Sequence, residues 1–258
     1  MIWIIGHFLA ICIGLSLGLI GGGGSILAVP ILIYVMKIGA KEAITMSLFI
    51  VGSVSLIGAI PHWMQGNLNW RVAGTFAPAA MLGAYLGARI AAFDFITETF
   101  QLICFAVIMV LASVLMIRKG KPPVKNQDSE PENDSHQEGH SQWWAIPLEG
   151  LGVGILTGFV GVGGGFAIIP ALVLLGGIPM KEAIGTSLII IAFKSMTGFA
   201  GYLDQVELDW ALMISFTIAA SFGTIAGAYL TRLIDAKSLQ KGFGYFVLAV
   251  GIFVLIQR

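Results

Sequence analysis

The chain has 258 residues, no formal net charge and 11% charged residues, whereas an average soluble domain has roughly 25%. Its 57% hydrophobic content excludes an ordinary soluble domain, and the balanced charge gives no reason to expect a nucleic-acid partner. Apolar stretches long enough to cross about 30 Å of hydrocarbon recur along the chain, which predicts an all-α polytopic membrane protein surrounded by membrane lipid.

The hydrophobic pattern divides the chain into apolar segments in a regular order. The N-terminal run lacks the basic start of a signal peptide, so we expect it to remain as the first helix. Segment 118–142 is charged and contains prolines, which predicts a flexible linker between membrane repeat 1 (1–117) and membrane repeat 2 (143–258). The predicted helices cover 2–20, 26–37, 41–61, 71–91 and 97–117 before the linker, and 144–160, 166–177, 181–201, 210–232 and 238–256 after it.

The two repeats are related by a constant offset of 140 positions. From Gly18 to Trp70, 19 of 53 positions are identical to those 140 residues later, and no gap is needed. Each repeat has a glycine cluster followed by a helix of about 12 residues, which rises roughly 18 Å and is too short to span the bilayer. The clusters are therefore expected at the tips of broken or re-entrant helix pairs. An odd number of crossings per repeat makes the repeats inverted, as in many secondary transporters.

The arginines and lysines favour one orientation, because these residues concentrate on the cytoplasmic side. The linker side holds nine of them, which are Arg71, Arg118, Lys119, Lys121, Lys125, Lys181, Arg232, Lys237 and Lys241. The other side holds Lys37, Lys41, Arg89 and Arg258. The distribution predicts a multi-pass protein of the cell membrane with a cytoplasmic linker and both termini outside.

The glycine clusters are the first candidate site. Consecutive glycines interrupt a helix and free backbone N–H groups, which attract anions. No Lys-Ser/Thr follows and no strand precedes, so a phosphate loop is excluded. The later glycines, in "GAYLGAR" from Gly83 and "GTIAGAY" from Gly223, are instead expected to allow close helix packing. The site candidates are Gly21, Gly22, Gly23, Gly24, Ser25, Gly163, Gly164 and Gly165.

Polar side chains in the apolar helices add further candidates. Lys194 is expected inside the membrane, opposite Val54 of the other repeat, where an ammonium suits an anion; the alternative is a lysine that reaches an interface. Hydroxyl and amide groups are weighed against ordinary helix packing. These candidates are Ser47, Thr186, Ser187, Ser195, Gln65 and Gln205.

Two ionisable residues are candidates for proton coupling, and a third is expected to be solvated. Glu149 and His7 are candidate proton carriers, because such groups relay protons in transporters. His62 is expected near an interface as a solvated histidine. No metal site and no cofactor are expected.

Several motifs occur in both repeats, namely the glycine cluster and proline, "KEAI", "TSL" or "MSL", and the Gln-x-x-x-x-Trp ending. This duplicated combination resembles the TauE/SafE family of sulfite and organosulfonate exporters. The resemblance implies a secondary transporter of a small sulfur-containing anion such as sulfite, thiosulfate or sulfoacetate, with the glycine-rich repeats at Gly21–Ser25 and Gly163–Gly165. Met46 stands where the second repeat has Thr186, so symmetric hydroxyl coordination is not expected.

The combined expectation is alternating access driven by a proton gradient, with the anion between the glycine tips and no enzymatic activity. Four alternatives stay open: a channel, a transporter of another small anion such as a carboxylate, a transporter of a metal cation held by freed carbonyls, and an intramembrane serine protease. The protease would use Ser25 with His7 or His62, but Gly165 replaces Ser25 in the second repeat.

Overall fold

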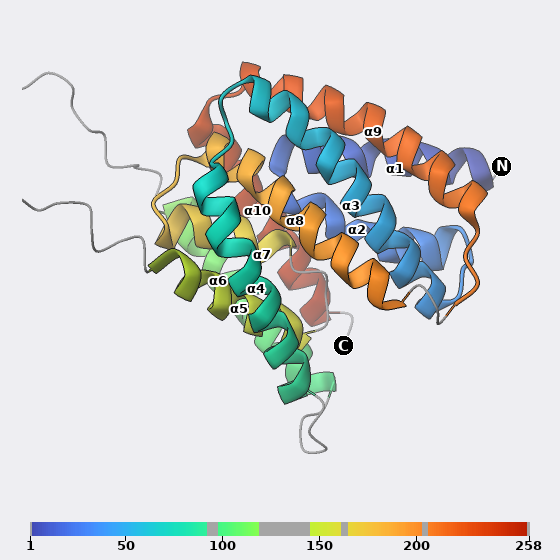
Figure 1. Cartoon of the computed structure of the whole chain (residues 1–258), viewed down its shortest axis with the longest axis horizontal. Coiled ribbons are helices and arrows are strands. Elements are labelled where there is room, and N and C mark those ends of the chain that lie inside the picture. The colour runs from blue at the N-terminus through green and yellow to red at the C-terminus, as the bar shows by residue number, and fades with distance from the viewer. Residues whose placement is uncertain (1, 92–97, 119–144, 161–164, 203–205, 257–258) are drawn as a thin grey trace, which may run out of the picture.

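The computed structural model describes residues 2–91, 98–118, 145–160, 165–202 and 206–256. Within these ranges every regular element is a helix or a helical turn, and no strand occurs (Figure 1). The prediction of an all-α chain is confirmed.

The elements follow one another in the same order in both halves. The first half contains α1 (Ile2–Ile20), the 3₁₀ turn η1 (Gly22–Gly24), α2 (Ser25–Pro30), the π-helical turn η2 (Ile31–Val35), α3 (Ala40–Met64), α4 (Trp70–Ala91) and α5 (Glu98–Arg118). The second half contains α6 (Ala145–Val160), α7 (Gly165–Pro170), the π-helical turn η3 (Ala171–Leu175), α8 (Met180–Tyr202), α9 (Trp210–Leu233) and α10 (Ala236–Ile256). The predicted helix boundaries agree with these to within a few residues. The predicted linker lies almost wholly outside the described residues.

The short helix of each half ends at a proline that is followed by a π-helical turn. Proline has no N–H, and its ring pushes away the carbonyl one turn earlier, which favours a wider turn. After Pro30, the Met36 N–H donates to the Ile31 carbonyl at 3.2 Å, five residues back. The equivalent bond closes η3 after Pro170. Each short helix and its π-helical turn together cover about 16 Å, too little to cross a bilayer.

Helices α1 and α9 pack in parallel, with glycines at the contact. A Cβ on Gly14 would overlap the Ala220 carbonyl, and one on Gly18 would overlap that of Thr224. The repeat-equivalent helices of the opposite halves, α6 and α4, pack in the same way. A Cβ on Gly158 would overlap the Ala84 carbonyl. Each half therefore places its first helix against the fourth helix of the other half.

The later glycine pairs have the packing role that the sequence predicts. A Cβ on Gly83 would overlap the Leu151 carbonyl, and one on Gly223 would overlap the Ile11 carbonyl. These backbones approach so closely that no side chain fits between them, which is the usual arrangement at small-residue helix contacts in membranes.

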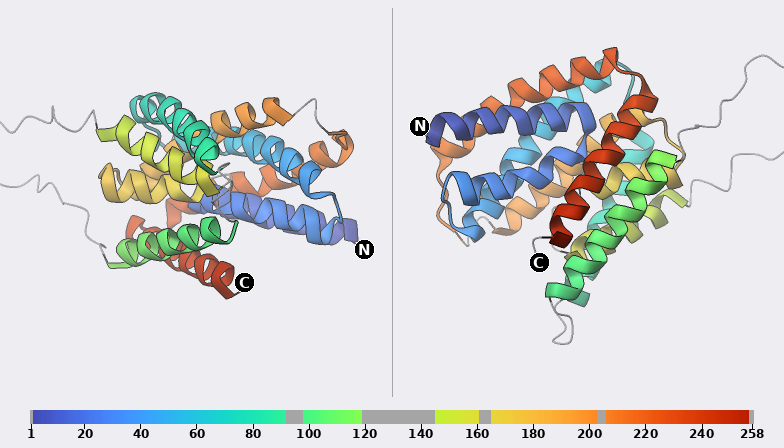
Figure 2. Two further views of the ribbon diagram at one scale, coloured as in Figure 1. Left: turned by 90° about the horizontal axis from the view of Figure 1, so that it is seen from below. Right: turned by 180° about the vertical axis from the view of Figure 1, so that it is seen from behind.

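Helices α3 and α8 cross antiparallel in the middle of the molecule. Gly52 lies against Met196, and Gly58 lies against Leu188. Helices α5 and α10 form a separate antiparallel pair at one side of the bundle (Figure 2). We call the end at which α4, α6 and α8 begin the linker end, and the end at which α1, α3 and α9 begin the N-terminal end.

Four helices in the described ranges are long and apolar enough to cross a membrane, namely α1, α3, α8 and α9. The largest buried cluster of apolar side chains joins these helices to α2, η2, α4 and η3. A second cluster lies between the α5–α10 pair and α8 and includes Met116, Ile184 and Phe243. The glycines of the first cluster lie between α1 and α2, and Gly165 of the second cluster begins α7.

Two glycines on α6 give a matched test of the close packing. Gly154→Ala is expected to destabilise the protein by about 1–3 kcal/mol, because the new methyl group would overlap the Ala80 carbonyl. Gly152→Ala is expected to leave stability unchanged or slightly raised, since nothing lies within 4 Å of a Cβ there and alanine favours a helix. Melting temperatures of the two variants in detergent check this, and equal values would contradict the α4–α6 contact.

Candidate functional site

Helix α1 is interrupted at the first glycine cluster. Gly21 has φ +70°, which side chains other than glycine rarely adopt, and Gly22–Gly24 then form one 3₁₀ turn before α2 begins at Ser25. The Gly21 N–H still donates to the Leu17 carbonyl at 2.7 Å. The predicted helix break is therefore confirmed for the first cluster. In the second cluster, Gly163 and Gly164 lie outside the described residues, and Gly165 is the first residue of α7.

The two glycine clusters touch each other through their backbones. A Cβ on Gly22 would overlap the Gly165 carbonyl, and a Cβ on Gly165 would lie 3.1 Å from the Gly22 oxygen. Helix α8 covers the same point, since Ser187 Oγ would lie 2.6 Å from a Cβ on Gly21. Gly22 of the first break and Gly165, the first residue of α7, therefore meet in the middle of the molecule.

The candidate hydroxyl groups are mostly bonded to their own helices. Ser25 donates to the Gly22 carbonyl at 2.7 Å, Ser47 to that of Ile44 at 2.7 Å, and the equivalent Ser187 to that of Ile184 at 2.8 Å. Ser195 is buried. These serines serve helix packing in the described state, as in the alternative considered above. A ligand would have to compete with the backbone for Ser25, Ser47 and Ser187.

Lys194 lies half-buried on α8, one helical turn after a residue that packs against Gly165. Its Nζ donates to Thr157 Oγ1 of α6 at 2.9 Å, and that hydroxyl donates to a carbonyl of its own helix. Ile191, one helical turn before Lys194, would lie 3.0 Å from a Cβ on Gly165. In the first half the equivalent positions hold Leu17 and Val54, both buried. The polar pair is therefore present in only one half.

A set of hydrogen bonds joins the turn between α3 and α4 to α8 and α9 at the linker end. Gln65 Nε2 donates to the Ala228 carbonyl of α9 at 3.2 Å. Asn69 donates twice to α8, through its backbone N–H to Thr186 Oγ1 at 3.0 Å and through Nδ2 to Glu182 Oε1 at 2.7 Å. We call Asn69, Thr186 and Glu182 the linker-end latch. Gln205, which corresponds to Gln65, lies outside the described residues.

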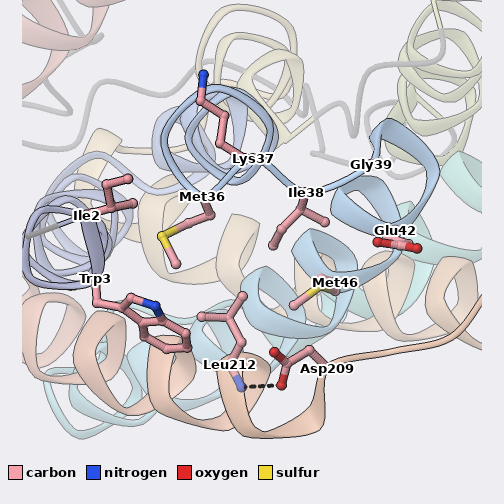
Figure 3. A pocket seen from close by; sticks show the side chains of 10 residues that line it. All are labelled: Ile2, Trp3, Met36, Lys37, Ile38, Gly39, Glu42, Met46, Asp209 and Leu212. Carbon is pink, nitrogen blue, oxygen red and sulfur yellow. Dashed lines mark hydrogen bonds between the residues drawn. The ribbon is translucent and has the colours of Figure 1, made fainter.

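The equivalent positions at the N-terminal end form an open pocket instead. Asp209, Met46 and Glu42 correspond to the three latch residues, and all three line a pocket of about 520 Å³ together with Lys37 (Figure 3). Asp209 Oδ1 accepts the Leu212 N–H at 3.0 Å as a helix cap. The Asp209 carboxylate has no N–H to donate to Glu42, unlike the Asn69 amide. Met46 has no hydroxyl oxygen to accept a backbone N–H, unlike Thr186. The different residues at equivalent positions therefore allow the latch hydrogen bonds at the linker end but not at the N-terminal end.

The sequence prediction for His62 is wrong. The residue is fully buried, with 0% of its side chain exposed, near the end of α3. Its Nε2 lies 2.9 Å from the Gly18 carbonyl of α1, whereas its Nδ1 is buried without a hydrogen-bond partner. His62 is buried because α1 and α8, which are distant in the sequence, pack over the end of α3.

The two proton-carrier candidates lie at opposite ends. His7 is on the second turn of α1, where Nδ1 lies 2.8 Å from the Trp3 carbonyl. Glu149 is on the second turn of α6 and lines an apolar pocket of about 620 Å³ between α5, α6, α7, η3 and α10; its Oε2 is buried and unpartnered. They therefore do not form a pair, and each stays a separate prediction.

The comparisons with known proteins agree with this architecture. A family model described as sulfite exporter TauE/SafE matches residues 7–254. A probable membrane transporter protein of Xylella fastidiosa is 32% identical over 94% of this chain and 91% of its own length. The probable membrane transporter protein YdhB of Bacillus subtilis is 24% identical over 89% and 90%.

A probable membrane transporter protein of Methanocaldococcus jannaschii is 25% identical over 96% of this chain and 95% of its own length. No solved structure matches the chain. The long apolar helices α1, α3, α8 and α9 of this chain agree with the membrane location that the relatives' names indicate. The family match covers nearly the whole chain, and so the chain belongs to the TauE/SafE sulfite exporter family as a multi-pass membrane transporter.

Proposed function

We propose that the chain is a secondary transporter that moves a small sulfur-containing anion, such as sulfite, thiosulfate or sulfoacetate, across the cell membrane. The contact of the two glycine breaks carries the proposal. Breaks in membrane helices are tolerated where they are enclosed by protein or line a polar cavity, and transporters use such breaks as binding sites. Gly22 and Gly165 meet between the long helices, where neighbouring backbone N–H groups can face a ligand.

Lys194 supports an anion rather than a cation. Its hydrogen-bond partner in the described part of the chain is the hydroxyl of Thr157 and not a carboxylate, so its positive charge is not neutralised. Lysines inside membranes usually mark a ligand or ion pathway because their burial is unfavourable without a counter-charge. The sulfur-containing class follows from the family; another small anion such as a carboxylate is the alternative that the same groups would accept.

Alternating access is supported by the unequal ends. If the two repeats are inverted, the linker end and the N-terminal end are equivalent by symmetry, and each can adopt the arrangement of the other. The latch then closes one end while the pocket at Asp209 and Glu42 opens the other. With the linker in the cytoplasm, as the arginines and lysines favour, this state is open to the outside. A proton gradient is the proposed driving force.

Uptake into proteoliposomes tests the function. The purified protein is expected to accumulate radiolabelled sulfite, thiosulfate or sulfoacetate in response to an inward or outward proton gradient, and to be stabilised thermally by its substrate. Saturable counterflow is expected because a carrier exchanges bound substrate; large unitary currents would indicate a channel instead. Stabilisation and uptake confined to simple carboxylates would replace the sulfur-anion assignment by the alternative, and no uptake of either class would contradict the proposal.

A further inference from the structure

We propose that His62 is the proton-binding group that controls the linker-end closure, neutral while that end is closed and protonated when it opens. This inference rests on the proposed transport function, which it extends by naming how pH acts on one side of the site. Neither the family match nor the names of the relatives assigns a role to this residue.

His62 lies where the elements of the linker-end closure converge. A Cβ on Gly185 of α8 would overlap the Asn67 carbonyl and lie 3.0 Å from His62 Cβ. The Asn67 N–H donates to the His62 carbonyl at 2.9 Å, so the residue also holds the turn that leads to the latch. Separation of α8 from α3 at this end would therefore expose His62 to water.

The hydrogen bond to Gly18 and the unpartnered Nδ1 together favour a neutral ring in the closed form. A carbonyl oxygen only accepts, so Nε2 carries a hydrogen, and a buried Nδ1 without a partner is better left unprotonated. The same carbonyl accepts Thr231 Oγ1 at 3.4 Å, and it lies three residues before the break at Gly21. A proton on Nδ1 would create a second N–H donor, and the described structure offers it no acceptor.

Within the part of the chain that the structure describes, no hydrogen bond or ion pair joins the His62 ring to a charged side chain. On α8, Glu182 is bonded to Asn69, and Lys181 donates to the Arg232 carbonyl at 3.5 Å. On α9, Arg232 is exposed and lies over the Tyr229 ring; on α1, the ionisable side chain is His7 at the far end. The exposed Arg71, which follows the turn, is a further like charge. A buried, unpaired cation is strongly unfavourable, so protonation favours the open form, in which water solvates the ring.

This device is present at one end only. Tyr202 occupies the position equivalent to His62 in the second repeat, and a tyrosine does not take up a proton near neutral pH. Histidine changes charge between about pH 5 and pH 8. Acidification on the linker side is therefore expected to open that end without the same effect on the other.

The test measures how fast a thiol at the closure reacts with a water-soluble methanethiosulfonate. Asn67→Cys is made in a Cys12→Ser, Cys104→Ser background, and rates are divided by those of the same protein unfolded in detergent at the same pH. The normalised rate is expected to rise about tenfold between about pH 8 and about pH 5. Adding Asn69→Asp, which removes the amide donor to Glu182, is expected to give fast labelling at both pH values.

His62→Gln supplies the decisive variant. Its amide nitrogen can still donate to the Gly18 carbonyl, but it binds no proton, so the pH dependence is expected to disappear. His7→Gln and Glu149→Gln test the rival proton carriers in the same assay. The proposal is overturned if labelling does not depend on pH in the parent protein, if it still does so with His62→Gln, or if either rival substitution alone removes the dependence.

A second measurement decides the matter should His62→Gln fail to fold. Ring ¹⁵N spectra of the wild-type chain in nanodiscs are expected to show one histidine as the neutral Nε2–H form at about pH 8, and as imidazolium at the pH where labelling is fast. A His62 signal that stays neutral, or whose titration does not follow the labelling, overturns the proposal. Neither readout needs a substrate, so absent anion uptake beside pH-dependent labelling would reject the transport function and leave the switch standing.

Discussion

Gly22→Ala is expected to weaken anion binding and uptake, because the added methyl group would occupy the place of the Gly165 carbonyl. Both partners of this contact are backbone, so no side-chain rotation relieves the overlap and the two breaks must move apart. Overpacking of this kind costs about 1–3 kcal/mol. If the breaks form the anion site, this energy corresponds to roughly a five- to 150-fold loss of affinity. Substrate-dependent thermal shifts and initial uptake rates in proteoliposomes measure the loss.

Gly74→Ala is the matched control for this substitution. Gly74 is exposed on α4, and nothing lies within 4 Å of a Cβ built there, so the same chemical change is expected to leave uptake and stability unaltered. Gly165→Ala tests the contact from the other half, where Ser25 Oγ would lie 2.8 Å from the added carbon. Wild-type affinity in both contact variants would show that the breaks do not bind the anion.

The local features of this fold follow from local patterns in the sequence. A run of consecutive glycines interrupts the helix after α1 because Gly21 adopts φ +70°, and Pro30 and Pro170 are each followed by a wider, π-helical turn. The constant offset of 140 then predicts that the second half repeats the same elements. The close glycine contacts are predictable for the same reason, since four-residue spacing of small side chains forms a packing face.

The arrangement around His62 could not be predicted in this way. Its burial depends on Gly18, which is 44 residues away, and on Gly185, which belongs to the other half. The latch at the linker end includes a hydrogen bond from the Asn69 amide to the Glu182 carboxylate, and these residues are 113 positions apart. Aligned repeats show that Asp209 and Glu42 stand at the equivalent positions, but only the contacts show that the first pair is bonded and the second lines a pocket.

Lys194→Met is expected to remove most of the anion affinity while the protein remains at least as stable. Hydrogen bonds to charged groups contribute about 1.5–3 kcal/mol, so the dissociation constant of the anion is expected to rise roughly 10- to 150-fold. The methionine side chain has a similar shape and fits among apolar helices. Since Thr157 is the lysine's hydrogen-bond partner and no counter-charge is lost, the melting temperature without substrate is expected to be unchanged or higher.

The change in dissociation constant and the change in melting temperature together distinguish a binding role of Lys194 from a structural one. If Lys194 only tied α8 to α6 through Thr157, then Lys194→Met and Thr157→Val would lower the melting temperature alike and leave the dissociation constant unchanged. Lys194→Arg retains the charge and is expected to keep part of the affinity, whereas Lys237→Met, at an exposed position on α10, removes a lysine without effect. The charge beside the second glycine break would then account for anion selectivity, and the first half, with Leu17 and Val54 at the equivalent positions, would contribute backbone alone.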